Sequence, residues 1–323
     1  MALVDQLNAT TSEFYWPSVV SQVVTSTPFL TRLFKRKKTR GDGTKFRWSI
    51  AHKLNTGQWY SGYELLDVTP TDDISEAELD WVNFHIPLSI SGDEIDKNQG
   101  PERIHDLLAE KMKLAKQAAV YYMGKGIWRG QAALKEPVGI FYAVAEAPTG
   151  TTYAGITRTT EDAGSGDFTN WFWNQFKDGG DAAPTLAGFE EVFNNCERGE
   201  AQPTVIVATR EGYSKYWSIA QPYQRIPHDD ISAIGFKSLT FNGVPVIKDD
   251  HCYKAAVDST SSNYYFLHEP DLELRFITGK FMDRTEWVIP RDQDAMTCAI
   301  RNKFVFAVKT PKLHGVYHSC LTT

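Results

Sequence analysis

Apolar and polar residues alternate in two runs near the start of the chain, at 45–52 and 79–90. Alternation with a period of two is typical of half-buried β-strands. In the second run the apolar side changes after Trp81, as a bulge or a bend in the strand produces. Gly57 and Gly62 lie between the two runs. We therefore predict a long β-hairpin with an irregular tip.

A helical period follows the hairpin and predicts one long helix over 101–123. Pro101 suits the first helical position, and we expect Gly124 and Gly126 to end the helix. The face expected to be buried consists of Ile104, Leu108, Met112, Ala115, Ala119 and Tyr122. Such a helix is roughly 35 Å long, which suits a spine beside the hairpin.

Helices and strands are mixed along the rest of the chain. We predict a short helix over 19–24, ended before Pro28, and a loop-rich region over 137–180 broken at Gly179–Gly180. Further predicted elements are helices over 184–198 and 213–219, strands over 205–208, 264–267, 272–276 and 304–308, and a hairpin over 239–247 turning at Asn242–Gly243. The order lacks the regular unit of a doubly wound sheet, so the predicted fold class is α+β.

The predicted hairpin carries charge of one sign. Between Lys53 and Lys97 the chain has ten acids and no lysine or arginine. Just upstream lies the opposite sign, in the basic run Arg32, Lys35, Arg36, Lys37, Lys38 and Arg40. Because an isolated two-stranded hairpin is only marginally stable in water, we expect another surface, most simply another copy of the chain, to support it.

The basic run has three interpretations: a solvated surface, a contact with nucleic acid backbone, or an acceptor for the hairpin of a neighbouring copy. We favour the third, with a smaller share for the second. The predicted inter-subunit pairs join Arg32, Lys35, Arg36, Lys37 and Lys38 to Asp72, Asp73, Glu76, Glu78 and Asp80 of another copy. Trp59 and Tyr60 near the tip are predicted anchors of this interface; packing of Trp59 within its own loop is the alternative.

Composition narrows the class of protein further. The chain has 323 residues with nine Trp, 14 Tyr and 18 Phe, which argues against a disordered protein, and a net charge of −6, which argues against a dedicated duplex-DNA binder. The sequence has no signal-peptide pattern and no run of 18 apolar residues, so no membrane partner is expected. The four unevenly spaced cysteines are expected to be reduced and mostly buried.

Two clusters carry residue types that catalysis or metal binding uses. Asp249–Asp250–His251–Cys252 contains a Cys–His pair, but adjacent residues of an extended chain point to different sides, so we interpret it as an acidic turn with Cys252 packed inward. His228–Asp229–Asp230 offers carboxylates to a hard cation, and a joint cation site with Asp249 and Asp250 stays open. No nucleotide-binding, serine-hydrolase or zinc-protease motif occurs. We predict neither an enzyme nor a bound cofactor.

The order of the parts resembles the major capsid proteins of tailed phages, which have the Hong Kong 97 fold. Locally, the segments 203–209, 234–247, 265–267 and 272–274 are similar to stretches of that family. The resemblance implies an N-terminal arm (1–43), an extended loop (44–92), a peripheral domain (93–137 and 296–323) and an axial domain (138–295). It also implies that the extended loop lies across the neighbouring subunit.

The function implied by the resemblance is that of a self-assembling shell subunit. Such a protein forms hexamers and pentamers in an icosahedral virion head, is made in the host cytoplasm, and meets a portal, possible scaffolding or decoration proteins and packaged double-stranded DNA. Only about 40 residues precede the hairpin, so we expect any scaffold to be a separate protein, and Met1 favours an untrimmed chain. The alternatives are an encapsulin-like nanocompartment and a hydrolase that uses His251 and Cys252.

Overall fold

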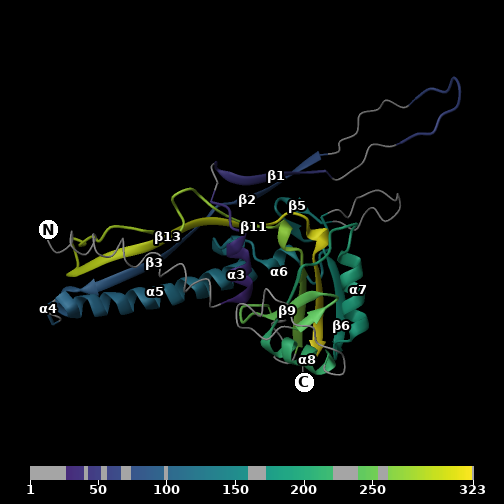
Figure 1. Ribbon diagram of the computed structural model, residues 1–323. Coiled ribbons are helices and arrows are strands. Elements are labelled where there is room, and N and C mark those ends of the chain that lie inside the picture. Colours follow the sequence, from purple (N-terminus) through teal and green to yellow (C-terminus); the bar gives the residue numbers. More distant parts are fainter. Residues whose placement is uncertain are drawn as a thin grey trace.

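The computed structural model describes residues 27–39, 43–51, 57–66, 74–97, 101–158, 172–220, 239–253 and 261–321. The predicted helix over 19–24 and the His228–Asp229–Asp230 turn lie outside these residues. Within them, helices are combined with mainly antiparallel sheets, so the α+β prediction is confirmed. An elongated part, a compact part and a projecting two-stranded ribbon make up the molecule (Figure 1).

The elongated part is a four-stranded sheet covered by one long helix. β3 (Val82–Ser91) pairs antiparallel with β13 (Ala295–Val308), and the other half of β13 pairs with β11 (Leu272–Phe276). α5 (Pro101–Arg129) lies along β3 and β13 (Figure 1). The smaller elements of this part are β12 (Asp283–Arg284), α4 (Gly92–Lys97), η1 (Ala132–Leu134) and α6 (Ile140–Ala143).

The predicted hairpin was wrong in its second strand. β1 (Lys45–Ala51) pairs with β2 (Ile74–Asp80), and β3 leaves the ribbon to join β13. The change of apolar side after Trp81 therefore marks the point where one continuous stretch of chain passes from one sheet to another. The ribbon is consequently shorter at its root than the sequence suggested.

Helix α5 was predicted to end six residues too early, because Gly124 and Gly126 lie inside it. Both glycines allow close packing: a Cβ on Gly124 would lie 2.6 Å from the His251 ring, and one on Gly126 would lie 3.3 Å from Pro137. Met112, Ala115 and Ala119 are buried as predicted, whereas Tyr122 is exposed. The side chains of Ile104 and Leu108 lie outside the described ones.

Gly139 follows the end of α5 and has no space for a side chain. A Cβ there would lie 2.7 Å from the Trp128 carbonyl group and 2.8 Å from the Gly130 nitrogen, all of which are backbone atoms. We expect Gly139→Ala to lower the free energy of unfolding by about 1–3 kcal/mol. Gly57→Ala is the control, because nothing lies within 4 Å of its Cβ position. Urea unfolding of both variants checks this; equal midpoints would contradict the packing described.

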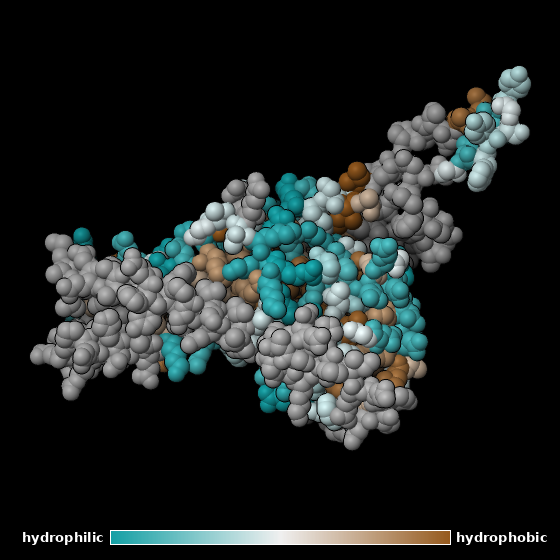
Figure 2. Space-filling model, in the orientation of Figure 1, coloured by the Kyte–Doolittle hydropathy of each residue, from teal (hydrophilic) through white to brown (hydrophobic). Residues whose placement is uncertain are grey.

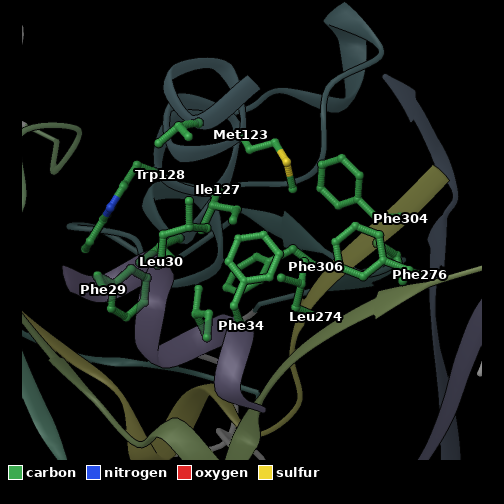
Figure 3. Close-up of a cluster of buried hydrophobic side chains, with 14 of the residues drawn as sticks. Phe29, Leu30, Phe34, Met123, Ile127, Trp128, Leu274, Phe276, Phe304 and Phe306 are labelled. Atoms are coloured by element: carbon green, nitrogen blue, oxygen red, sulfur yellow. The ribbon is translucent and has the colours of Figure 1, made fainter. Parts of the chain in front are cut away.

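The helix α3 (Pro28–Lys35) inserts into the centre of the core (Figure 3). Pro28 had been interpreted as a breaker, but it stands at the first turn of a helix, where its missing N–H costs nothing. The α3 side chains meet α5 on one side and the sheet on the other. The residues labelled in this cluster are Phe29, Leu30, Phe34, Met123, Ile127, Trp128, Leu274, Phe276, Phe304 and Phe306. The N-terminal arm is therefore fastened to its own subunit from Pro28 onward.

The compact part is a six-stranded sheet with the order β6-β14-β10-β7-β9-β8. Its strands are β6 (Gln175–Ala182), β7 (Val205–Ala208), β8 (Leu239–Phe241), β9 (Val244–Lys248), β10 (Ser261–Leu267) and β14 (Gly315–Leu321). The helices α7 (Leu186–Cys196) and α8 (Arg210–Ala220) pack on it. The remaining elements are β4 (Thr152–Tyr153), β5 (Ile156–Thr157), η2 (Glu269–Asp271) and η3 (Pro311–Leu313).

Several predictions for this part are confirmed. Both helices and the buried strand β7 lie where expected, and the Asn242–Gly243 turn has positive φ angles of 47° and 77°. Gly179 and Gly180 were wrongly interpreted as breakers: they lie within β6, where a Cβ on Gly179 would lie 2.9 Å from the Ser319 carbonyl oxygen. All four cysteines are free and buried, as predicted.

His314 is expected to make the stability of this fold depend on pH. It is fully buried, and its Nδ1 accepts a hydrogen bond of 3.2 Å from the His268 amide. Burial, with a smaller contribution from His268, lowers the pKa of His314 to about 3. Between pH 6.5 and 3 only the unfolded chain therefore binds this proton, so stability falls as pH falls.

We expect this group to cost about 2 kcal/mol of stability between pH 7 and pH 5. The His314→Asn variant keeps an acceptor but removes the titration, so its stability is expected to fall by that much less. Urea unfolding of both proteins at the two pH values measures the difference. Comparing the two is necessary because burial raises the pKa of Asp249 to about 6, which acts in the opposite direction. Parallel pH profiles would contradict the prediction.

Candidate functional site

The ribbon β1–β2 carries its charges as cross-strand pairs. Lys45 lies opposite Asp80 and Arg47 opposite Glu78. The Lys45 Nζ is 2.5 Å from a Glu78 oxygen, and Arg47 is 3.2 Å from Glu78 and 3.7 Å from Glu76. The hydrogen bond between Lys45 and Glu78 raises the pKa of the lysine and lowers that of the glutamate. Glu76, Glu78 and Asp80 were predicted to pair with the basic run of another copy. They pair instead with Lys45 and Arg47 of their own subunit.

Sequence reasoning missed this pairing, although the signal was present. Lys45 and Arg47 are the polar residues of the first alternating run, so they share one face of the ribbon with the acids opposite them. Asp72 and Asp73 lie outside the described residues. The ribbon is consequently less strongly acidic than its run of ten acids suggested.

The ribbon is anchored at its root and projects freely beyond it. Phe46 and Leu79 are buried, and the Arg275 guanidinium lies 4.8 Å from the Phe46 ring centre. The Glu78 amide donates a 3.0 Å hydrogen bond to the Ala154 carbonyl oxygen. Beyond β1 and β2, the segment 57–66 stands far from the rest of the molecule (Figure 1).

The tip segment 57–66 exposes large apolar side chains. Trp59 is 99% exposed and Tyr60 66%, so packing of Trp59 within its own loop is excluded for this subunit alone. Three more large side chains beside them are exposed, and none of these was predicted as an anchor: Tyr63, Leu65 and Leu66. Hydrophobic atoms are visible at the tip in Figure 2. Solvent-exposed apolar residues in such a group are typical of interaction sites.

A cleft of about 620 Å³ lies beside the root of the ribbon. It is bordered by the end of β2, the turn after α5 and the β4–β5 hairpin. Its apolar lining includes Trp81, Pro137, Tyr153 and Phe306. The buried Nε1 of Trp81 has no hydrogen-bond partner in the described part of the chain.

The basic run divides into two groups. Arg32 pairs with the buried Glu269 and Lys38 with Glu273 at 3.1 Å, while the Lys37 ammonium lies 3.7 Å from the Phe281 ring centre. These three side chains hold the arm on its own subunit. Lys35 and Arg36 are exposed and form no such contact in the described part of the chain, and Arg40 lies outside that part.

Glu273 is the centre of the first group. Lys38, Arg275 and Lys309 all form ion pairs with its carboxylate, whose side chain is only 4% exposed. Burial alone would raise the pKa of Glu273, but the hydrogen bonds from these three cations outweigh it and lower the pKa to about 2. Backbone bonds add to the anchor: the Lys38 amide donates to Leu274, and the Phe276 amide to Lys38. The carboxylate therefore stays ionised and joins the arm to β11.

The Asp249–Cys252 turn does not have the geometry of a catalytic site. Cys252 is buried, and burial raises the pKa of its thiol well above the usual value, so the reactive thiolate is not formed at neutral pH. His251 packs edge-on against Tyr121 at 5.0 Å, and Asp250 pairs with Arg210 at 3.0 Å. The interpretation of an acidic turn with Cys252 packed inward is confirmed.

Neither a metal site nor a membrane span was found in the described part of the chain. Across the described ranges, no group of three or more His, Cys, Asp or Glu side chains is arranged to hold a metal ion. The helices in those ranges include none that is both long and apolar enough to cross a membrane.

Comparisons with known proteins identify the fold. No family model matches the sequence, and no curated protein matches it. Among solved structures, the cyanophage A-1(L) capsid is 16% identical, with a TM-score of 0.65 over 92% of this chain and 93% of that chain. The holo-SrpI encapsulin of Synechococcus elongatus PCC 7942 is 12% identical, with a TM-score of 0.60 over 90% and 88%.

A third similar structure is the capsid of a native GTA particle, which is 12% identical, with a TM-score of 0.58 over 90% of both chains. All three are shell proteins, and the match extends over nearly the whole of each chain. The agreement therefore concerns the complete arrangement of helices and sheets and not a single motif. This chain has the Hong Kong 97 fold of phage capsid proteins.

Proposed function

We propose that this protein is the major capsid protein of a tailed double-stranded DNA phage and assembles into the icosahedral head shell. The observation that carries the proposal is the exposed apolar tip 57–66, at the end of a ribbon whose described anchoring contacts lie at its root. Exposed aromatic residues of this kind serve as anchors when a partner buries them. The Hong Kong 97 fold supplies the second support.

The partner that the tip requires is another copy of the chain. The cleft beside the ribbon root is a suitable seat, because its volume of about 620 Å³ exceeds that of an aromatic side chain and its lining is partly apolar. Hexamers and pentamers then form by repetition of one contact. A portal, scaffolding or decoration proteins and packaged DNA are the further proposed partners, in a virion assembled in the host cytoplasm.

The proposed domains follow the implied division, adjusted where the strand pairing requires it. β14 belongs with the axial domain, because it pairs with β6 and β10. β11 and β12 belong with the peripheral domain, because they pair with β13. β3 also belongs with the peripheral domain, because it pairs with β13, so the proposed extended loop covers 44–81. The arm (1–43) keeps its boundary.

The test is to express the chain and examine it by sedimentation velocity and negative-stain electron microscopy. Closed particles of uniform size are the expected result, and a monodisperse monomer at high concentration would overturn the proposal. A nanocompartment is the second candidate, favoured by the similarity to the SrpI encapsulin. A protein cargo inside purified particles, with no nucleic acid, would support that candidate.

The exposed part of the basic run gives a prediction about assembly. Lys35→Glu with Arg36→Glu is expected to prevent particle formation without unfolding the chain, because both side chains lie on the surface and reversed charges at an interface exclude the partner. Sedimentation velocity measures assembly, and circular dichroism measures whether the chain is folded. Arg198→Glu with Arg291→Glu, at two exposed sites outside the basic run, is the control of equal charge change. Particles of normal size in the double variant would remove these two residues from the proposed interface.

A further inference from the structure

Helix α5 presents an exposed, acid-free stripe of side chains. From Lys111 to Arg129 its sequence contains no Asp or Glu, although the whole chain has a net charge of −6. Lys113, Gln117, Tyr121, Lys125 and Arg129 follow one another at intervals of four residues, and all are exposed. Residues four apart lie on neighbouring positions of a helix surface. The stripe is about 24 Å long.

The helix dipole does not account for this pattern. Cations near a helix C-terminus are favoured only within the last turn, which explains Arg129 but not Lys113, four turns earlier. Ion pairs within the subunit do not account for Lys113 and Lys125 either. Lys111 pairs with Glu94 at 2.7 Å, but no ion pair to Lys113 or Lys125 was found in the described part of the chain.

The surroundings of the stripe are cationic and aromatic. His251 packs against Tyr121, and Arg129 donates to the Cys252 carbonyl oxygen at 3.2 Å and lies 5.6 Å from the Tyr253 ring. The neighbouring acid, Asp250, is already paired with Arg210. A ligand approaching this surface therefore meets positive charge and aromatic faces.

The stripe lies on one side of the molecule. α5 covers one face of the β3–β13 layer, and the ribbon projects on the opposite side (Figure 1). If the shell wall is one subunit thick, the solvent-exposed face of α5 lies on one surface of the wall and the root of the ribbon on the other.

We propose that the exposed face of α5 from Lys113 to Arg129 binds the phosphate backbone of nucleic acid. The inference rests on the proposed function and deepens it, since it names the surface on which an enclosed genome lies. Lysine and arginine bind phosphates irrespective of base sequence, because the binding releases condensed counterions. Contacts with the bases are not needed. An acidic polypeptide is the competing occupant, and the experiment separates the two.

The test measures fluorescence anisotropy of a labelled 30-base-pair DNA duplex with the full-length unassembled subunit, as a function of salt. We compare the wild type with Lys113→Gln/Lys125→Gln and with a control of equal charge change, Arg198→Gln/Arg291→Gln, at exposed sites elsewhere. Neutralising two phosphate contacts is expected to lower the slope of log K against log salt by about 2. The control is expected to keep the wild-type slope.

Each other outcome has a defined meaning. Equal slopes in all three proteins, or no binding by the wild type at 50 mM salt, would overturn the inference. Binding of labelled poly-glutamate in preference to the duplex would overturn it in favour of an acidic protein partner. Electron microscopy of the same preparations keeps the proposed function separate: closed shells combined with unchanged DNA binding reject the α5 surface alone.

Discussion

Replacing Trp59 and Tyr60 by serine is expected to abolish particle formation while leaving the subunit folded. Both side chains are exposed at the tip and belong to neither core cluster, so their removal leaves the core of the described part of the subunit intact. In an interface, central aromatic anchors are each worth about 2–4 kcal/mol. A shell repeats the contact at every subunit, so a loss of this size per contact shifts assembly far toward free subunits.

The measurement is sedimentation velocity of the double variant at the concentration where the wild type forms particles. Unchanged urea unfolding is expected alongside, which shows that the defect lies in association. Gln58→Ser, one position away in the same segment, is the matched control and should assemble. Particles of normal size in the Trp59/Tyr60 variant would exclude these residues as anchors.

Glu273→Ala is expected to lower the free energy of unfolding by about 3 kcal/mol. The substitution leaves Lys38, Arg275 and Lys309 without their common carboxylate. The loss lies at the lower end of values for buried ion pairs, because the three cations are 30–56% exposed and are partly solvated. The exposed Glu286→Ala is the control and should change stability by about 0.5 kcal/mol or less.

The pH dependence of the same variant gives an independent check. The folded-state pKa of Glu273 is about 2 and its ordinary value is 4.5, so the stabilisation is complete above pH 4.5 and is lost as pH falls toward 2. The variant lacks this contribution at every pH. The stabilities of wild type and variant are therefore expected to converge in acid, as measured by urea unfolding at pH 7 and pH 3. A constant difference would contradict the assigned role.

Local patterns predicted elements well where tertiary partners did not alter the outcome. The Asn242–Gly243 turn and the strand over 205–208 required only turn chemistry and a short apolar run. Helix α5 was placed correctly at its start, but its end depended on glycines that pack closely against His251 and Pro137. The sequence alone does not reveal whether a glycine ends a helix or allows another segment to pack closely against it.

The ribbon shows the same limit at the level of strand pairing. Alternation showed that 45–52 and 79–90 are extended, but it contains no information about which strands pair. The pairing of β3 with β13 joins residues more than 200 positions apart, and such non-local contacts follow from the whole fold. Trp59 and Tyr60, which the sequence suggested as interface anchors, are exposed at the tip, and their role as anchors stays a prediction.

The prediction for the basic run was less complete. The length of the run and its positive charge suggested that all its residues bind the acidic hairpin of another copy. However, Arg32 and Lys38 pair with Glu269 and Glu273, more than 230 residues away along the chain. Among the described residues of the run, Lys35 and Arg36 are exposed and form none of these contacts. A charge run read from the sequence thus combines residues that the fold separates.

The most direct test of the central claim is photo-crosslinking from position 59 in assembled particles. The variant carries a benzophenone amino acid in place of Trp59, and particles are assembled from an equal mixture of isotopically light and heavy chains. Mass spectrometry of the crosslinked peptides is expected to show light–heavy pairs that join the tip to residues bordering the cleft. Crosslinks found only within one chain, with no mixed pairs, would contradict the claim that a sibling subunit holds the tip.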